Sequence, residues 1–272
     1  TLIFGIMGVI NLAHGSFYML GAYLAWSLTA QLGNFWLALL AGFVLSVVLG
    51  MLLEWLFIRH LYRRVHLQQV LLTYGLILIF SELRSIVWGE DVHSVAVPAL
   101  LAGSIPLTET LAYPVYRVWL SIVCVLLAAG MYYLIQHTRL GMMIRAGASN
   151  REMTQSLGID IGLLYRLVFA FGVALAAFAG MLAAPVSSVF PGMGNQVLII
   201  CFVVVVIGGI GSVKGAMAAA LLIGLVDTFG KVVDFEIGGF RVLPELAGMS
   251  VFVMMAIVLL WRPEGLFARR LR

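Results

Sequence analysis

The chain has 272 residues, of which 63% are hydrophobic and only 10% are charged. An average soluble domain has about 45–50% apolar and about 25% charged residues, so this composition excludes an ordinary soluble fold. The mean hydropathy of +1.10 indicates that most of the outer surface meets lipid. Since a membrane-spanning helix needs about 20 apolar residues, the sequence predicts an all-α polytopic integral membrane protein.

Apolar runs predict the membrane segments in chain order. The first run covers residues 1–30 and is interrupted at 11–16, and a later run covers 197–230 and is interrupted at 208–215. Uninterrupted runs lie at 35–58, 70–88, 117–136, 166–184 and 245–261. We expect about eight membrane segments, two of them interrupted helices, in a single transmembrane domain over 1–272. Because the chain is already apolar at Thr1, the first helix is expected to lack its beginning.

Basic residues predict the orientation of these segments. They gather in segment 59–69, in segment 137–165 and its borders, and in the tail: Arg59, Arg63, Arg64, Arg139, Arg145, Arg151, Arg166, Arg262, Arg269, Arg270 and Arg272. By the positive-inside rule these three segments are cytoplasmic, which places the C-terminus inside. Segment 89–116 carries Glu90, Asp91 and Glu109 and is expected outside, as are 185–196 and 231–245.

The two interruptions predict the interior of the protein. Irregular backbone at membrane depth is tolerated only where protein or a watery cavity satisfies its polar groups, and paired breaks in two halves are typical of a transport pathway. Asn11, His14 and Gly15 lie in the first break, and a run of glycines including Gly208 lies in the second. Helix packing remains an alternative for each glycine, and capping or interhelical hydrogen bonding for the two polar side chains.

Charged residues near apolar runs allow two interpretations. Glu54, Glu82, Arg84 and Asp227 are costly in a membrane and are expected either to pair or to couple ions, with pairing favoured. Asp227 and Lys231 are four residues apart and can pair on one helix face. Glu82 and Arg84 are two apart and need other partners. Glu54 is expected to reach the cytoplasmic interface.

Segment 137–165 is polar, yet apolar residues recur in it at helical spacing. Leu140, Met143 and Ile144, then Met153 and Leu157, predict two short amphipathic helices ending near Gly141 and Gly158. Such helices either dock in a groove of a partner protein or lie on the membrane surface.

Several motifs carry a family resemblance over essentially the whole chain. The sequence SLGI at 156–159 resembles the end of the coupling loop of ABC-transporter permeases. Together with NLAHG at 11–15, YMLG at 18–21, TYGL at 73–76 and GGIGS at 208–212, it is similar to the branched-chain amino-acid permease family of the LivH/LivM type, on the LivH-like side. The family often has alanines where this chain has Thr154 and Gln155, and an asparagine where it has Glu82.

The resemblance implies an importer subunit with alternating access in a bacterial inner membrane, for branched-chain or other small amino acids or amides. Its partners would be a second permease, identical or homologous, two ATP-binding subunits and an extracytoplasmic substrate-binding protein. It implies a substrate pathway at Asn11, His14, Gly15, Tyr18, Thr73, Gly75, Gly208, Gly209 and Gly211. It implies contacts with the ATPase at Arg145, Ala146, Asn150, Met153, Leu157, Gly158 and Ile159.

Other classes of function find less support in the sequence. The glycine run at 208–215 fits neither the phosphate loop nor the dinucleotide-binding pattern, so ATP and Mg²⁺ would be bound by partner subunits, with no cofactor in this chain. No catalytic or metal-binding motif is present, and basic residues lie between apolar runs rather than on one face for nucleic acid. A stand-alone secondary transporter or channel that uses Glu82, Asp227 or His14 remains the alternative.

Overall fold

The computed structural model describes residues 3, 7–9, 11–62, 64–106, 112–232, 236–237, 240–241 and 244–267, with side chains described outside 231–247. Its long elements are helices, which confirms the all-α class. The helices are α2 (His14–Leu32), α3 (Phe35–Leu56), α4 (His66–Trp88), α5 (Val115–His137), α6 (Arg139–Ser149), α7 (Arg151–Ser156), α8 (Ile161–Ala183), α9 (Met193–Gly208), α10 (Val213–Val232) and α11 (Pro244–Trp261). Short 3-10 turns, η1 (Ile58–His60) and η2 (Ala99–Leu101), follow α3 and precede the first strand.

Two small hairpins complete the described secondary structure. Strand β1 (Ser104–Pro106) pairs antiparallel with β2 (Ala112–Pro114), with Ser104 opposite Pro114. Strand β3 (Glu236–Ile237) pairs with β4 (Phe240–Arg241) in the same manner. Both lie in segments that the charge distribution predicts to be outside the membrane.

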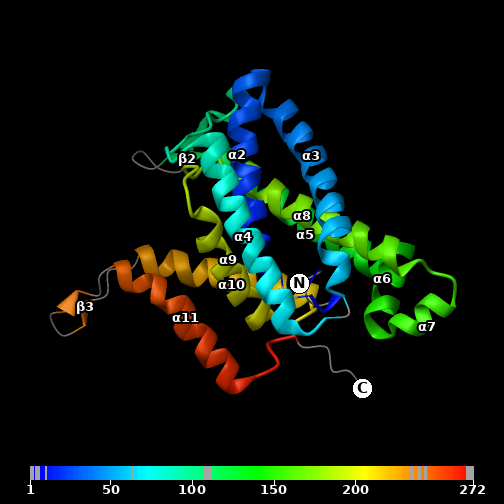
Figure 1. Ribbon diagram of the computed structural model, residues 1–272. Helices are drawn as coiled ribbons and strands as arrows, with labels where there is room; N and C mark the ends of the chain where they lie inside the picture. Colours follow the sequence, from blue (N-terminus) through cyan, green and yellow to red (C-terminus); the bar gives the residue numbers. More distant parts are fainter. Residues whose placement is uncertain are drawn as a thin grey trace. The chain divides into compact units, whose positions relative to one another are not determined.

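The chain forms two compact units, Met7–Leu198 and a C-terminal unit of Thr1–Ile6 and Ile199–Arg272. In the larger unit, α2 and α3 form an antiparallel pair that packs on α8 (Figure 1). Gly33 ends α2 in the left-handed conformation at φ 63°, and the Asn34 side chain accepts hydrogen bonds from the backbone N–H groups of Trp36 and Leu37. A glycine stop followed by an asparagine N-cap explains why the chain turns here.

Small residues allow α2 and α8 to approach closely. A Cβ atom at Gly21 would collide with the carbonyl oxygen of Ala177, and one at Gly180 would collide with the carbonyl oxygen of Tyr18. Close backbone approach at small residues is the usual means of helix association in membranes, where lipid removes the hydrophobic driving force. Helix α8 is the central element of this unit, because 61% of the residues in its most apolar stretch are buried.

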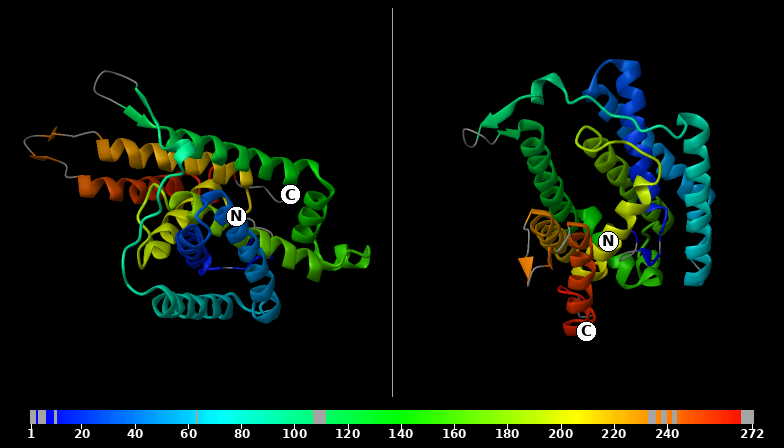
Figure 2. Two further views of the ribbon diagram at one scale, coloured as in Figure 1. Left: turned by 90° about the horizontal axis from the view of Figure 1, so that it is seen from above. Right: turned by 90° about the vertical axis from the view of Figure 1, so that its left-hand side faces the viewer.

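Helices α4 and α5 lie on opposite sides of the group formed by α2, α3 and α8 (Figure 2). Within the most apolar stretch of each helix, only 6% of the residues of α5 and 22% of those of α4 are buried by the rest of the chain. Their apolar side chains therefore face outward, as expected for contact with lipid or with a partner's membrane helices.

In the C-terminal unit, α10 packs against α11 around an apolar cluster. The cluster consists of Val203, Ile207, Ala219, Ile223 and Val251. The backbone N–H of Leu266 donates to the carbonyl oxygen of Ile207 at 2.8 Å, which attaches the segment after α11 to the end of α9.

Five described helices are long and apolar enough to cross a membrane: Phe35–His60, His66–Trp88, Val115–His137, Ile161–Ala183 and Val213–Gly230. Met193–Gly208 and Gly248–Trp261 are shorter apolar helices. The helices agree with the predicted apolar runs, whereas the total of eight membrane segments stays a prediction.

Three predicted boundaries were wrong. The first interruption was expected at 11–16, but α2 already begins at His14 and includes Gly15 and Ser16. The second was expected at 208–215, but α9 extends to Gly208 and α10 already begins at Val213. The first short cytoplasmic helix was expected to end near Gly141, but Gly141 lies in the first turn of α6. There the Thr138 hydroxyl oxygen accepts a hydrogen bond from the Gly141 N–H at 3.1 Å, so this threonine begins a helix.

Some predictions fall outside the described residues. These are the positions of Arg63, Glu109, Arg269, Arg270 and Arg272, and the side chain of Lys231 as the partner of Asp227.

Candidate functional site

Asn11, in the first interruption, forms a turn just before α2. Its Oδ1 atom accepts a hydrogen bond from the Ala13 N–H at 3.0 Å, immediately before α2 begins. Its Nδ2 atom is buried without a hydrogen-bond partner among the described residues. His14 is half-buried, and its ring lies edge to face with Phe17 at 6.4 Å between centroids. Asn11 therefore stabilises the turn before α2 without capping the helix, and its Nδ2 donor stays unpaired among the described residues.

Gly15 and Tyr18 lie on α2 where it meets other helices. A Cβ atom at Gly15 would collide with the carbonyl oxygen of Gly194 at the start of α9, so Gly15 has a packing role. Tyr18 is half-buried, and its backbone faces Gly180. The packing interpretation therefore accounts for the glycine, while Tyr18 packs against the apolar core of this unit.

The next two predicted pathway residues lie on α4, which contacts α2 through the rings of Phe80 and Phe17, 5.6 Å apart. Thr73 is buried and its hydroxyl donates to the Gln69 carbonyl oxygen at 2.9 Å. A Cβ atom at Gly75 would meet nothing within 4 Å. Packing within the described chain therefore does not explain this glycine.

The glycines of the second interruption belong to the C-terminal unit. Gly209 and Gly211 have φ of 92° and 80°, a region that side chains rarely adopt. Gly208 approaches the backbone of Gly215, and the Ser212 hydroxyl accepts a hydrogen bond from the Gly215 N–H at 3.0 Å. Backbone conformation and close approach therefore require these glycines, whatever further role they have in transport.

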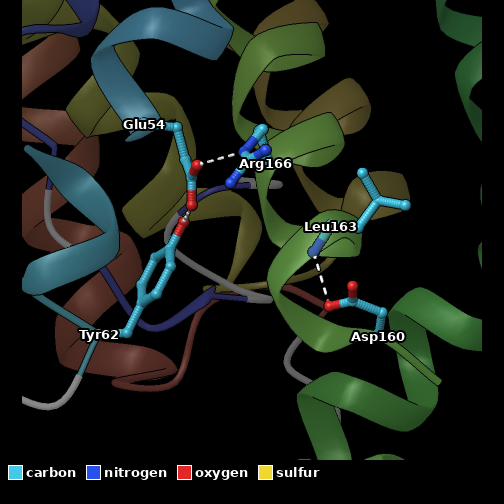
Figure 3. Close-up of polar contacts among 5 residues, drawn as sticks. All are labelled: Glu54, Tyr62, Asp160, Leu163 and Arg166. Carbon is cyan, nitrogen blue, oxygen red and sulfur yellow. Dashed lines mark hydrogen bonds and ion pairs between the residues drawn. The ribbon is translucent and has the colours of Figure 1, made fainter. Parts of the chain in front are cut away.

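The predicted coupling residues gather on α6, α7 and the turn before α8. Asn150 ends α6 and caps α7, since its Oδ1 atom accepts from the Met153 N–H at 2.9 Å. Gly158 follows α7 with φ of 84°, as expected for a glycine that ends a helix. Asp160 then caps α8 by accepting from the Leu163 N–H at 3.0 Å (Figure 3). Helices α7 and α8 thus each begin at a polar side chain that caps them.

The side chains of this loop divide into anchored and exposed ones. Arg145 donates to the Ile135 carbonyl oxygen and so ties α6 to the end of α5. Ile159 is half-buried, whereas Ala146 is exposed. Met153 and Leu157 are 62% and 75% exposed, which leaves two large apolar side chains without cover at the tip of α7.

Thr154, where the family often has alanine, fits within α7. Thr154 is buried, and its hydroxyl donates to the Asn150 carbonyl oxygen at 2.7 Å. Gln155 is exposed. The threonine therefore satisfies its hydroxyl locally, and only Gln155 adds a polar group to the exposed surface.

A buried charge cluster lies beside this loop. Glu54, for which pairing was favoured, is only 1% exposed and does pair, whereas the expectation that it reaches the cytoplasmic interface was wrong. Its Oε2 atom pairs with Arg166 Nε at 3.0 Å, and its Oε1 atom accepts a hydrogen bond from the Tyr62 hydroxyl at 2.9 Å (Figure 3). The signal was present, because a carboxylate in an apolar run needs a counter-charge and Arg166 borders another such run.

Glu82 and Arg84 do not pair with each other. Arg84 is buried, with Nη1 donating to the Gly89 carbonyl oxygen at 2.7 Å and Nη2 pairing with Glu90 at 3.1 Å. Hydrogen bonds from Arg84 and Ser85 lower the pKa of Glu90. Glu82 is exposed on the outer face of α4. The expectation that Arg84 needs a partner other than Glu82 is confirmed.

The comparisons with known proteins decide the family. A family model described as "Branched-chain amino acid transport system / permease component" matches residues 1–260. The chain belongs to this permease family. Its members are transport components, and together with the apolar helices this identifies the chain as a multi-pass membrane protein.

Individual relatives agree with the family match. The permease protein BraD of a high-affinity branched-chain amino acid transport system from Pseudomonas aeruginosa is 31% identical over 283 residues, covering 99% of this chain and 89% of the relative. The corresponding LivH protein of Escherichia coli is 29% identical over 285 residues, with the same coverage. The ribose import permease protein RbsC of Escherichia coli is 30% identical over 103 residues, covering 35% of this chain and 32% of the relative. No solved structure matches the chain.

Proposed function

We propose that the chain is the transmembrane permease subunit of an ATP-driven ABC importer for branched-chain amino acids or related small amino acids and amides. Family membership supports the transport role. The observation that supports coupling to separate ATPase subunits is the tip of α7, where Met153 and Leu157 expose 62% and 75% of their surface beside a glycine-ended helix. An apolar pair on a short helix fits a groove on a partner protein.

In this proposal the complex contains a second permease, identical or homologous, two ATP-binding subunits and an extracytoplasmic substrate-binding protein. ATP and Mg²⁺ are bound by the ATPase subunits, and this chain carries no cofactor and has no enzymatic activity of its own. The complex lies in the bacterial inner membrane with the C-terminus of this chain in the cytoplasm. Nucleotide binding shifts the population between inward- and outward-facing states, which gives alternating access.

The proposed substrate pathway uses the residues of both interruptions and of α4. Asn11, whose Nδ2 donor is unpaired among the described residues, is a candidate for a polar contact with the solute, and Thr73, whose buried hydroxyl donates to the Gln69 carbonyl oxygen, belongs to the same proposed pathway. Gly75 leaves open space on α4, and His14 and Tyr18 line the start of α2. The glycines at 208, 209 and 211 provide the backbone conformation of the second break.

A substitution at the tip of α7 tests the coupling role. Leu157 packs against little of this chain, so Leu157→Glu should leave the fold intact but place a charge in the docking groove. We expect ATP-dependent leucine uptake by reconstituted complexes to fall about tenfold or more, the size of effect typical of a buried anchor at an interface. Leu157→Met keeps an apolar side chain of similar volume and serves as the matched control, with uptake close to that of the parent protein.

Two results would overturn the proposal. One is undiminished uptake by Leu157→Glu together with purification of the chain without any ATP-binding subunit. The other is leucine uptake by this chain alone in liposomes, driven by an ion gradient without ATP, which would instead identify a secondary transporter.

A further inference from the structure

The guanidinium group of Arg151, the first residue of α7, lies against two tyrosine rings. Its central carbon is 5.3 Å from the ring centroid of Tyr62 and 4.9 Å from that of Tyr165. The two rings meet edge to face, with centroids 5.2 Å apart and an interplanar angle of 77°. A cation within about 6 Å of an aromatic face is attracted by the ring electrons, and arginine suits such contacts because it is flat and weakly hydrated. One side chain of the loop thereby contacts two other segments of the fold.

Both tyrosines are themselves held in place. The Tyr62 hydroxyl donates to Glu54 at the end of α3, and Glu54 pairs with Arg166 on α8 (Figure 3). The Tyr165 hydroxyl donates to the Gly147 carbonyl oxygen of α6 at 3.4 Å. Burial, and then the charge of Glu54, raise the pKa of Tyr62, so its hydroxyl remains a donor at neutral pH. We call Glu54, Tyr62 and Tyr165 the arginine cradle.

Helix α7 has one side turned toward the arginine cradle and another side exposed. At 100° per residue, Arg151 and Met153 lie on nearly opposite sides of the helix, Thr154 lies within 60° of Arg151, and Leu157 follows the last residue of the helix. Thr154 is buried, whereas Met153 and Leu157 are exposed. A helix of six residues is too short to be stable without tertiary contacts. Its inner side is therefore held by the cradle while its outer side is presented to a partner.

We propose that Arg151 is a positioning residue that fixes α7 for the ATPase partner, and that the arginine cradle transmits displacement of α7 to α3 and α8. This inference rests on the proposed function, because it assigns the anchoring of the same docking surface. Tyr62 and Glu54 connect the cradle to α3, and Tyr165 and Arg166 connect it to α8. A push or pull on α7 thus reaches two of the three helices that form the centre of the larger unit.

Hydrogen exchange in the purified chain tests the anchoring without any partner. In Arg151→Ala, the amides of α7 should exchange about tenfold faster, which corresponds to the loss of one cation–π anchor, while those of α3 and α8 keep their protection. Arg151→Lys, whose compact ammonium cannot lie flat against two rings, should show an intermediate rate. Arg59→Ala, at an exposed arginine outside the loop, is the control and should leave the rates unchanged.

Reconstituted complexes test the coupling. With leucine as the probe solute, Arg151→Ala should still assemble and hydrolyse ATP but transport about tenfold less solute per ATP. Tyr62→Phe, which keeps the ring and loses only the hydrogen bond to Glu54, should lie between Arg151→Ala and the parent protein. Arg59→Ala should retain the parent ratio.

The outcomes separate the inference from the proposed function. If the amides of α7 exchange at the parent rate in Arg151→Ala, Arg151 does not anchor α7, whatever the transport measurement shows. Faster exchange with an unchanged ratio of solute to ATP overturns the transmitting role. Absence of ATP-dependent uptake by the parent complex contradicts the proposed function, and the exchange result then still decides whether Arg151 anchors α7.

Discussion

Glu54 and Arg166 form a pair of unequal burial, and this predicts unequal effects when either one is replaced. The Glu54 side chain is 1% exposed, whereas that of Arg166 is 35% exposed. Removal of Arg166 leaves a buried carboxylate without its counter-charge, while removal of Glu54 leaves an arginine that water can reach. Breaking a buried pair costs about 3–5 kcal/mol, and partial exposure reduces this, so Arg166→Met should lower the free energy of unfolding by about 2–3 kcal/mol. Glu54→Gln, which keeps an acceptor for Tyr62, should lower it by about 1 kcal/mol.

Thermal unfolding of the purified variants in one detergent checks this order. Arg166→Lys, which keeps the charge, is the matched control and should fall between the parent protein and Arg166→Met. A larger loss in Glu54→Gln than in Arg166→Met would contradict the assignment of Glu54 as the buried partner.

The Glu54 pair also shows what the sequence could not predict at the residue scale. The need for a partner was predictable, because a carboxylate in an apolar run is costly. The partner was not, since Arg166 is 112 residues away and only the packing of α3 on α8 brings them together. The same holds for Arg151 and its two tyrosines, which come from three segments of the chain. By contrast, the caps at Asn34, Asn150 and Asp160 are local and follow from residue type.

At the scale of elements, the crossing of α2 and α8 predicts intolerance of even one added methyl group. A Cβ atom at Gly21 or at Gly180 would collide with a backbone carbonyl oxygen of the facing helix, which a rotamer change cannot relieve. We expect Gly21→Ala and Gly180→Ala each to lower the free energy of unfolding by about 1–3 kcal/mol. Gly130→Ala on α5 is the matched control, because its Cβ would meet nothing within 4 Å.

Unfolding midpoints and the fraction of protein that elutes as a single species in detergent measure the effect. The control should be neutral or slightly more stable, since alanine favours helix more than glycine does. Equal behaviour of Gly130→Ala and Gly180→Ala would show that the close approach of α2 and α8 is not a determinant of stability.

Element positions were largely predictable because long apolar runs have few alternatives in a membrane. The run at 35–58 became α3 with its 3-10 turn, and the run at 117–136 became α5 with one or two residues more at each end. Errors arose where a polar side chain sets a boundary. Asn11 accepts from the Ala13 N–H in a turn just before α2, which begins at His14, and Thr138 caps α6 before Gly141. Runs of hydrophobic residues do not reveal which side chain will cap.

At the scale of the molecule, the larger unit places its acidic and basic loops toward opposite ends. The turn between α2 and α3 and the hairpin of β1 and β2 lie toward one end, and α6 and α7 lie toward the other, where α3 ends (Figure 1). Helices α4 and α5 run between these ends (Figure 2). The arrangement agrees with the positive-inside prediction that segment 89–116 is outside and segment 137–165 is in the cytoplasm.

Cysteine labelling in whole cells tests this orientation. Ser104 on β1 and Ser149 at the end of α6 are both exposed serines, so a cysteine at either position should react with a thiol reagent that can reach it. The native thiols, Cys124 and Cys201, lie in apolar helices and are replaced by alanine in the background chain. With a membrane-impermeant reagent, Ser104→Cys should be labelled once the outer membrane is opened, and Ser149→Cys only after the inner membrane is permeabilised. Labelling of Ser149→Cys from outside would invert the topology, and the surface of α7 would then face away from any cytoplasmic ATPase.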